Sequence, residues 1–407
     1  MALDNVSKAL TIKNIPDREQ RYIEAAKALF ARNYDNAASL YEALLVEYPF
    51  EMEARHLLAN SYWGQYKAED AIRELQTLAV EEPQNEVIWS TLGSYLLNIG
   101  DFERAQPALE RYAKLAPDDA NSYALLGDSH RFRGQYQAAR AQYMQALAID
   151  PNMRTVAASL ATIAYLEGNY QAAEQGFAAI VADQSLIISE RLDSMFSLQA
   201  LLAARGDFTA ADSLLTQFSE ALKEEKIREA MATSIRALLQ LELGNQASAR
   251  ELSISAISLS PGVPTRYLFS RGLVELYLKE YEKVFATAAE LISFALPIED
   301  PDRTEERAAA YLSGMAWLAQ GDLAQAETEL RKASNLEGYT YRIYDLGLAR
   351  LLMQKNQTDE ALELVRLSVL PEKVEPRIDL EPERVRAILL CAEIQRQAGA
   401  SRVAEQI

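Results

Sequence analysis

Histidine and cysteine, the side chains that most often hold metals or act as bases and nucleophiles, are scarce in this sequence. His56 and His130 are the only two histidines, and Cys391 is the only cysteine. A structural zinc site takes four such ligands, so these three residues cannot complete one. The sequence also contains no phosphate-binding glycine loop, no dinucleotide fingerprint, no H-E-x-x-H pair and no G-x-S-x-G elbow. We therefore expect no catalytic residue, no metal and no cofactor.

Carboxylates are abundant, and their excess bears on which partners the chain suits. The 59 Asp and Glu against 41 Lys and Arg give a formal charge of −18. Proteins bind nucleic acids and anionic membranes mainly through Lys and Arg, so we expect neither as a partner. Pairs of acids on helix surfaces are explained by solvation. The charge therefore indicates solubility first and a preference for basic partners as the alternative.

The composition favours a folded helical protein. Hydrophobic residues make up 49% of the chain and charged residues 25%, with Ala, Leu and Glu plentiful. No apolar run reaches the roughly 18 residues of a membrane helix, and the first 20 residues lack the apolar core of a signal peptide. We expect a cytoplasmic protein without membrane insertion. A periplasmic fragment of a membrane-anchored protein is the alternative.

Prolines recur at a fixed interval of 34 residues, at Pro49, Pro83, Pro117 and Pro151. Between them the same residue types return at the same places. In the unit 86–119 these places hold Trp89, Leu92, Gly93, Leu96, Gly100, Phe102, Ala105, Leu109, Tyr112 and Pro117. In the next unit they hold Tyr123, Leu126, Gly127, His130, Gly134, Tyr136, Ala139, Tyr143, Ala146 and Pro151. These residues and spacings resemble the tetratricopeptide repeat family, whose helix–turn–helix unit has about 34 residues.

This resemblance implies an all-α protein, a right-handed α-solenoid (superhelix) of about ten tetratricopeptide helix–turn–helix repeats, in which the first helices line a concave groove. Small residues at the eighth place of each unit should let the second helix come close. These residues are Ala25, Ala59, Gly93, Gly127 and Ala161. Glycines after the first helix should adopt left-handed backbone. These glycines are Gly100, Gly134, Gly168, Gly206, Gly244 and Gly321.

The repeat pattern also predicts how the chain is organised. Residues 1–17 form an N-terminal arm or short helix, and residues 18–187 form five well-formed repeats. Five degenerate repeats follow in residues 188–375, and residues 376–407 form a C-terminal capping helix. A solenoid needs such a cap because its last repeat would otherwise leave an apolar face uncovered.

The groove-facing residues are predicted from helix geometry. If the fourth, eighth and eleventh places of a unit face its second helix, the fifth, ninth and twelfth places lie about 100° further round. In the early repeats these and adjacent places form a polar stripe, of which we select Tyr22, His56, Asn60, Trp63, Ser94, Asp128, Arg131 and Tyr165 as partner-binding candidates. In the later repeats they form an apolar stripe, represented by Phe269, Leu273, Tyr311 and Met315. Ordinary contacts between repeats are the alternative explanation for both stripes.

The function that follows is a non-enzymatic protein–protein interaction scaffold, or adaptor, that binds partner segments in the concave groove. An exposed apolar stripe would also suit self-association through the later repeats. The segment 15–49, IPDREQRYIEAAKALFARNYDNAASLYEALLVEYP, is similar to the repeat regions of bacterial Ser/Thr kinases and membrane-tethered transcriptional regulators. The alternative function is therefore a sensory or regulatory repeat region of a larger bacterial signalling protein.

Overall fold

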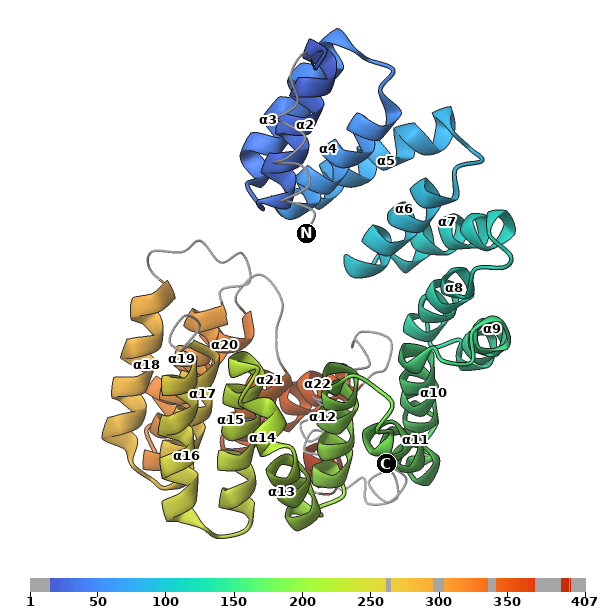
Figure 1. Ribbon diagram of the computed structural model, residues 1–407. Helices are drawn as coiled ribbons and strands as arrows, with labels where there is room; N and C mark the ends of the chain where they lie inside the picture. Colours follow the sequence, from blue (N-terminus) through green and yellow to red (C-terminus); the bar gives the residue numbers. More distant parts are fainter. Residues whose placement is uncertain are drawn as a thin grey trace. The chain divides into compact units, whose positions relative to one another are not determined.

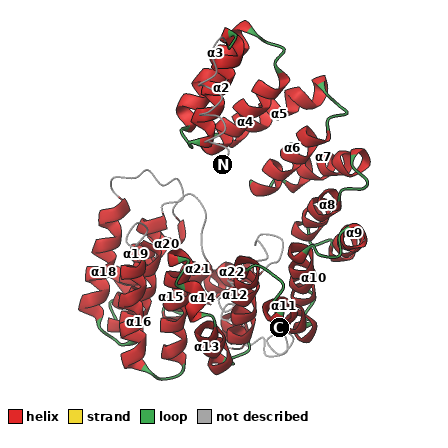
Figure 2. Cartoon of the chain, in the orientation of Figure 1, coloured by secondary structure: helices red, strands yellow, loops and turns green. Residues whose placement is uncertain are grey.

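The computed structural model in Figure 1 describes residues 15–260, 265–295, 304–335, 342–369, 389–394 and 396. Within these ranges every regular element is a helix (Figure 2), which confirms the predicted all-α solenoid class. The chain divides into two units, unit 1 (Met1–Ile163) and unit 2 (Ala164–Ile407). The predicted domain boundaries at residues 17, 187 and 375 stay predictions, and residues 1–14 of the predicted arm lie outside the described residues.

Unit 1 consists of helix pairs, and each helix from α2 to α8 packs on the next along the chain. Its helices are α2 (Asp17–Phe30), α3 (Tyr34–Glu47), α4 (Met52–Gly64), α5 (Ala68–Glu81), α6 (Glu86–Asn98), α7 (Phe102–Leu115), α8 (Ala120–Phe132) and α9 (Tyr136–Ile149). Helix α10 (Arg154–Leu166) crosses the boundary between the units. The first helices of successive pairs also contact each other directly. Helix α2 contacts α4, and α6 contacts α8.

Unit 2 continues the same alternation. Its helices are α11 (Tyr170–Ala182), α12 (Ile188–Ala204), α13 (Phe208–Gln217), α14 (Ser219–Leu222), α15 (Lys226–Glu242), α16 (Gln246–Leu259), α17 (Thr265–Tyr277), α18 (Tyr281–Ala295), α19 (Thr304–Gln320), α20 (Leu323–Asn335), α21 (Arg342–Gln354) and α22 (Thr358–Val369). Helix α15 contacts α17, α17 contacts α19, and α19 contacts α21, so these first helices form one layer. Residues 389–394 are helical and bury Leu390, Cys391 and Ile394 on the core of this unit. Apart from Arg396, the rest of the predicted capping helix lies outside the described residues.

The turn inside each helix pair has the left-handed backbone that the glycines predicted. Gly100, Gly134, Gly168, Gly206, Gly244 and Gly321 all have φ between 71° and 85°, which confirms that prediction. In four other pairs the equivalent residue is not glycine, yet it also has positive φ. These residues are Arg32, Tyr66, Lys279 and Asn356, with φ from 57° to 62°. The repeat therefore imposes this conformation whatever the side chain.

The second helix of several pairs begins immediately after that turn, at a capping side chain. The Asp101 carboxylate accepts a hydrogen bond from the Arg104 backbone amide at 3.0 Å, and Asp207 accepts one from the Ala210 amide at 3.0 Å. Such a cap satisfies an amide that has no partner inside the helix. A left-handed residue followed by Asp or Asn is thus the local signal that separates the two helices.

Small residues at the eighth place let the two helices of a pair meet. Ala25 and Ala59 are fully buried. At Gly127, an added Cβ would lie 2.5 Å from the Tyr143 ring, and at Gly93 it would overlap the Leu109 side chain. The predicted packing role of this place is confirmed, because neither glycine has room for a larger residue.

Candidate functional site

Three residues of the polar stripe form contacts between repeats. Helices α4 and α6 meet through Trp63 and Tyr95, whose rings stack with centroids 3.9 Å apart. The Tyr95 hydroxyl donates a hydrogen bond to Asn60 Oδ1 at 2.7 Å, and His56 Nε2 lies 3.3 Å from Thr91 Oγ1. Burial lowers the pKa of His56, so the ring is neutral near pH 7. These side chains tie neighbouring first helices together.

Two further residues of the polar stripe form a network with the second helix of their own pair. Asp128 Oδ1 accepts a hydrogen bond from the Tyr143 hydroxyl at 2.7 Å and forms an ion pair with Arg131 Nη2 at 3.2 Å. Arg131 Nε donates to the Tyr143 hydroxyl oxygen at 3.2 Å. Burial and the Asp128 charge raise the pKa of Tyr143, so its hydroxyl stays protonated as a donor. The three groups satisfy one another.

The remaining members of the polar stripe are also partly enclosed. Tyr22 is half-buried, with its ring edge-on to Tyr41 at 6.0 Å, and burial raises its pKa. Ser94 is half-buried on α6. Tyr165 is only 2% exposed, and its ring packs 5.6 Å from that of Tyr170. The stripe thus contributes to stability, and its role in binding a partner stays a prediction.

The apolar stripe borders a cavity of about 760 Å³ in unit 2, which we call the unit 2 cavity. First helices supply most of its lining. Its apolar lining includes Phe196 of α12, Leu238 of α15, Leu273 and Leu276 of α17, Tyr311 and Met315 of α19, and Ile343 of α21. The structure therefore brings together Leu273, Tyr311 and Met315, which the sequence had placed on one stripe in separate repeats.

Phe269, the other member of the apolar stripe, lies in the core of the layer. Its ring packs 5.9 Å from the Tyr311 ring and 6.2 Å from the Tyr344 ring, and the two tyrosine rings are 5.5 Å apart. This three-ring cluster joins α17, α19 and α21. Phe269 thus supports the helices that line the cavity instead of lining it.

Four charged residues also line the unit 2 cavity, and they differ in their partners. Asp193 forms an ion pair with Arg228 at 2.6 Å, and Glu242 also has a partner. Arg266 and Arg350 are exposed, and among the described residues neither side chain has a hydrogen bond or an ion pair. Neither arginine was predicted from the sequence as a partner-binding residue. Arg350 occupies the ninth place of its repeat and could have been found by extending the stripe, whereas Arg266 lies outside the stripe.

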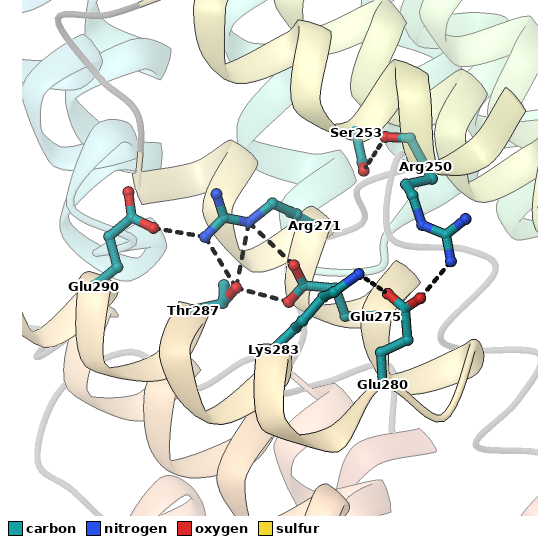
Figure 3. A network of polar contacts seen from close by, with 8 residues as sticks. All are labelled: Arg250, Ser253, Arg271, Glu275, Glu280, Lys283, Thr287 and Glu290. Atoms are coloured by element: carbon teal, nitrogen blue, oxygen red, sulfur yellow. Dashed lines mark hydrogen bonds and ion pairs between the residues drawn. The ribbon is translucent and has the colours of Figure 1, made fainter. Parts of the chain in front are cut away.

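A polar network holds α17, which carries Leu273, against α18 (Figure 3). Arg271 Nη2 donates to Thr287 Oγ1 at 2.9 Å and to Glu290 at 2.6 Å, and the Thr287 hydroxyl donates to Glu275 at 2.6 Å. Burial raises the pKa of Glu275 above its ordinary value. Because its members bond chiefly to one another, the network is suited to positioning a helix.

The described residues form neither a metal-binding cluster nor a helix that could cross a membrane. Within the ranges that the structure describes, no group of three or more His, Cys, Asp and Glu side chains is arranged to hold a metal ion. None of the described helices is both long enough and apolar enough to span a membrane.

Comparisons with known proteins agree with the fold. The sequence profile of the tetratricopeptide repeat matches residues 24–86, 90–154 and 124–185, and a second tetratricopeptide repeat profile matches residues 307–332. The formate-dependent nitrite reductase complex subunit NrfG of Escherichia coli O157:H7 is 28% identical over 171 residues, which cover 41% of this chain and 84% of that protein. The general transcriptional corepressor ssn6 of Schizosaccharomyces pombe is 30% identical over 30% of this chain and 11% of its own length.

Among solved structures, a chain of the APC/C hetero-tetramer Cut9–Hcn1 shares the fold. It superposes with a TM-score of 0.57 at 13% identity, and the match covers 99% of this chain and 73% of that one. Repeat profiles match both units, and the helix pairs carry the small residues and left-handed turns of the repeat. The chain therefore contains tetratricopeptide repeats, which the profiles match in both of its units.

Proposed function

We propose that the chain is a non-enzymatic scaffold for protein–protein interaction, and that the unit 2 cavity binds a segment of a partner protein. The observation that supports this most is the apolar lining of the cavity. Leu273 and Met315 are half-buried there, on the side of their helices that faces the cavity. A volume of about 760 Å³ is within the range of protein sites that enclose a ligand or a few side chains.

The expected affinity is moderate. A segment that inserts three or four apolar side chains removes on the order of 400 Å² of apolar surface from water, which at about 25 cal/mol per Å² contributes roughly 10 kcal/mol. Loss of translational and rotational freedom opposes this by several kcal/mol. A dissociation constant of about micromolar, near −8 kcal/mol, is therefore the plausible range once flanking contacts are added.

The test replaces apolar lining by charge. Leu273→Glu combined with Met315→Glu should abolish capture of the partner that the native chain recovers in a pull-down analysed by mass spectrometry. Ile254→Glu is the matched control, since Ile254 is 56% exposed on α16 and does not line the cavity. This control should capture the same partner as the native chain.

A second variant covers the case in which the double substitution unfolds unit 2. Ser270 lines the cavity and is half-buried, so Ser270→Trp fills the space without removing an apolar contact. Circular dichroism and thermal unfolding establish that each variant is folded. If a folded Ser270→Trp chain and a folded double variant both keep the partner, the cavity is not the binding site and the proposal is wrong.

Self-association through the same surface is part of the proposal, because a second copy could also cover the apolar lining. Light scattering measures it directly. A dimer that becomes a monomer in the Leu273→Glu, Met315→Glu variant identifies the occupant as a second copy of the chain. The part of the polar stripe that lies in unit 1 is proposed as a surface for a further segment. Such a segment would have to replace internal hydrogen bonds such as that between Tyr95 and Asn60.

A further inference from the structure

Positive charge at the unit 2 cavity stands out against an acidic chain. The net charge is −18, and among the described residues of unit 2 seven arginines form ion pairs with acids. These arginines form the pairs Arg205–Glu174, Arg228–Asp193, Arg236–Asp212, Arg250–Glu280, Arg271–Glu290, Arg331–Glu360 and Arg366–Glu363. Arg266 and Arg350, which both line the cavity, have no such partner among the described residues. The two acids that line it, Asp193 and Glu242, are already engaged.

The backbone positions of the two arginines are well separated along and across the helix layer. Arg266 is the second residue of α17, and Arg350 is the ninth residue of α21. Helix α19 lies between these helices, and axes of packed helices are about 8–10 Å apart, so the two arginines are separated by roughly 18 Å across the layer. First helices of successive repeats run in the same direction, and the offset of seven places adds about 10 Å along it. The two backbone positions are therefore roughly 20 Å apart, and a ligand of about that length can pair with both arginines.

The chemistry of the lining indicates the conformation of that ligand. The cavity is lined by helices, whose backbone groups are bonded within each helix. An extended peptide would therefore leave many of its own amides and carbonyls unpaired against apolar side chains, which is costly. A helix satisfies its backbone internally and presents apolar side chains at i, i+3, i+4 and i+7 to a groove. At 1.5 Å per residue, a helix of about 14 residues spans 20 Å.

We propose that the unit 2 cavity binds an acidic amphipathic helix of a partner protein, with its apolar face on the lining around Leu273 and Met315 and with Asp or Glu side chains near its two ends paired to Arg266 and Arg350. This inference rests on the proposed function, which it makes more specific in the charge and conformation of the partner segment. The acidic charge of the partner segment is inferred from the two unpaired arginines. Its helical conformation is inferred from the apolar lining, which consists of helices.

The experiment is a selection from a random peptide display library of about 18 residues, performed on the full chain. The peptides enriched by the native chain should be acidic and should show apolar residues at i, i+3, i+4 and i+7. A synthetic peptide of the enriched sequence should bind the Arg266→Glu, Arg350→Glu chain about tenfold or more weakly than the native chain, since charge reversal replaces two attractions by two repulsions. Its affinity for the native chain should also fall with salt.

The control variant is Lys279→Glu with Lys332→Glu, which makes the same change in net charge. Both lysines are exposed in unit 2 and neither lines the cavity. This variant should bind the enriched peptide within about twofold of the native chain. If it weakens binding as much as the arginine pair does, the effect is a general one of net charge and the proposal is overturned.

Other outcomes separate this inference from the proposed function. Peptides with no acidic bias that lose binding to Leu273→Glu, Met315→Glu, but not to the arginine variant, overturn the charge assignment and leave the scaffold function intact. Proline-rich or extended motifs overturn the helical assignment. If the peptides bind the native chain, the arginine variant and the Leu273→Glu, Met315→Glu variant with equal affinity, both proposals are overturned. If no peptide is enriched, the proposal of an acidic helix is overturned. The pull-down described above still tests the proposed scaffold function.

Discussion

Tyr66 is one of four described turn residues that have left-handed backbone although they carry a side chain. Its φ is 62°, in the left-handed region, and its side chain is 96% exposed. For a residue with a Cβ, left-handed backbone costs about 1–2 kcal/mol. Glycine does not have this penalty but loses about 0.4–1 kcal/mol more conformational entropy on folding. Tyr66→Gly should therefore stabilise the chain by about 0.5–1 kcal/mol, because almost no buried surface is lost.

Two comparison variants separate the cost of left-handed backbone from the effect of removing the tyrosine side chain. Tyr66→Ala removes the side chain but keeps the left-handed strain, so it should leave stability nearly unchanged. Gly134→Ala makes the reverse change at the equivalent place, where φ is 71° and an added Cβ would meet nothing within 4 Å. Since no clash contributes there, it should destabilise by about 0.5–1 kcal/mol, which is the strain less the entropy that alanine saves.

Urea unfolding followed by far-ultraviolet circular dichroism measures these differences as shifts of the midpoint. Repeat arrays can unfold in more than one step, so the midpoint of the first transition is compared across variants instead of a global free energy. The reasoning is refuted if Tyr66→Gly lowers the midpoint as Gly134→Ala does, or if Tyr66→Ala raises it as much as Tyr66→Gly.

Three further predictions concern packing and pH. Gly93→Leu should lower the unfolding midpoint by the equivalent of about 1–3 kcal/mol, because a side chain there overlaps Leu109; an unchanged midpoint would contradict the packing. Trp63→Ala should cost roughly 3–5 kcal/mol in chemical denaturation, since the indole stacks on Tyr95 and packs on the core, and a cost below about 1 kcal/mol would show that the stack is unimportant. Burial raises the pKa of Glu275 above 4.5, so the folded state binds the proton more tightly, and its contribution to stability is lost as pH rises from about 4.5 through the raised pKa. Denaturation midpoints measured across that window should therefore show a weaker decline for Glu275→Gln, and an identical pH dependence would refute the effect.

The fold was predictable because its signals are local and repeated. A small residue eight places into a unit and a glycine at the turn each act within one helix pair, so the sequence shows them directly. Gly127 against Tyr143 and Gly100 with φ 77° are such cases. Tyr66 shows the limit of that reasoning, because its left-handed turn is imposed by the repeat and not indicated by its own residue type.

The site was predictable only in part, because a place on a helix face does not specify what the side chain meets. Leu273 and Met315 do line one cavity. Trp63 lies on the same face of its helix, at the twelfth place, but it stacks on Tyr95 of the next repeat, and this contact depends on the residue 32 positions further along. Arg266 could not be found from the stripe, since it lies at the second place of its repeat and reaches the cavity from the helix end.

The two stripes differ because their side chains form different kinds of contact across the same spacing. In unit 1, residues 35 apart on neighbouring first helices pair through directed bonds, as His56 does with Thr91 and Asn60 with Tyr95. In unit 2 the same spacing brings Leu238 and Leu273 to the lining of one cavity. Hydrogen-bonded pairs satisfy each other and require no partner, whereas apolar side chains that border a cavity remain in contact with water until something covers them. This difference is the reason why we propose the unit 2 cavity, and not the polar stripe, as the main binding site for a partner segment.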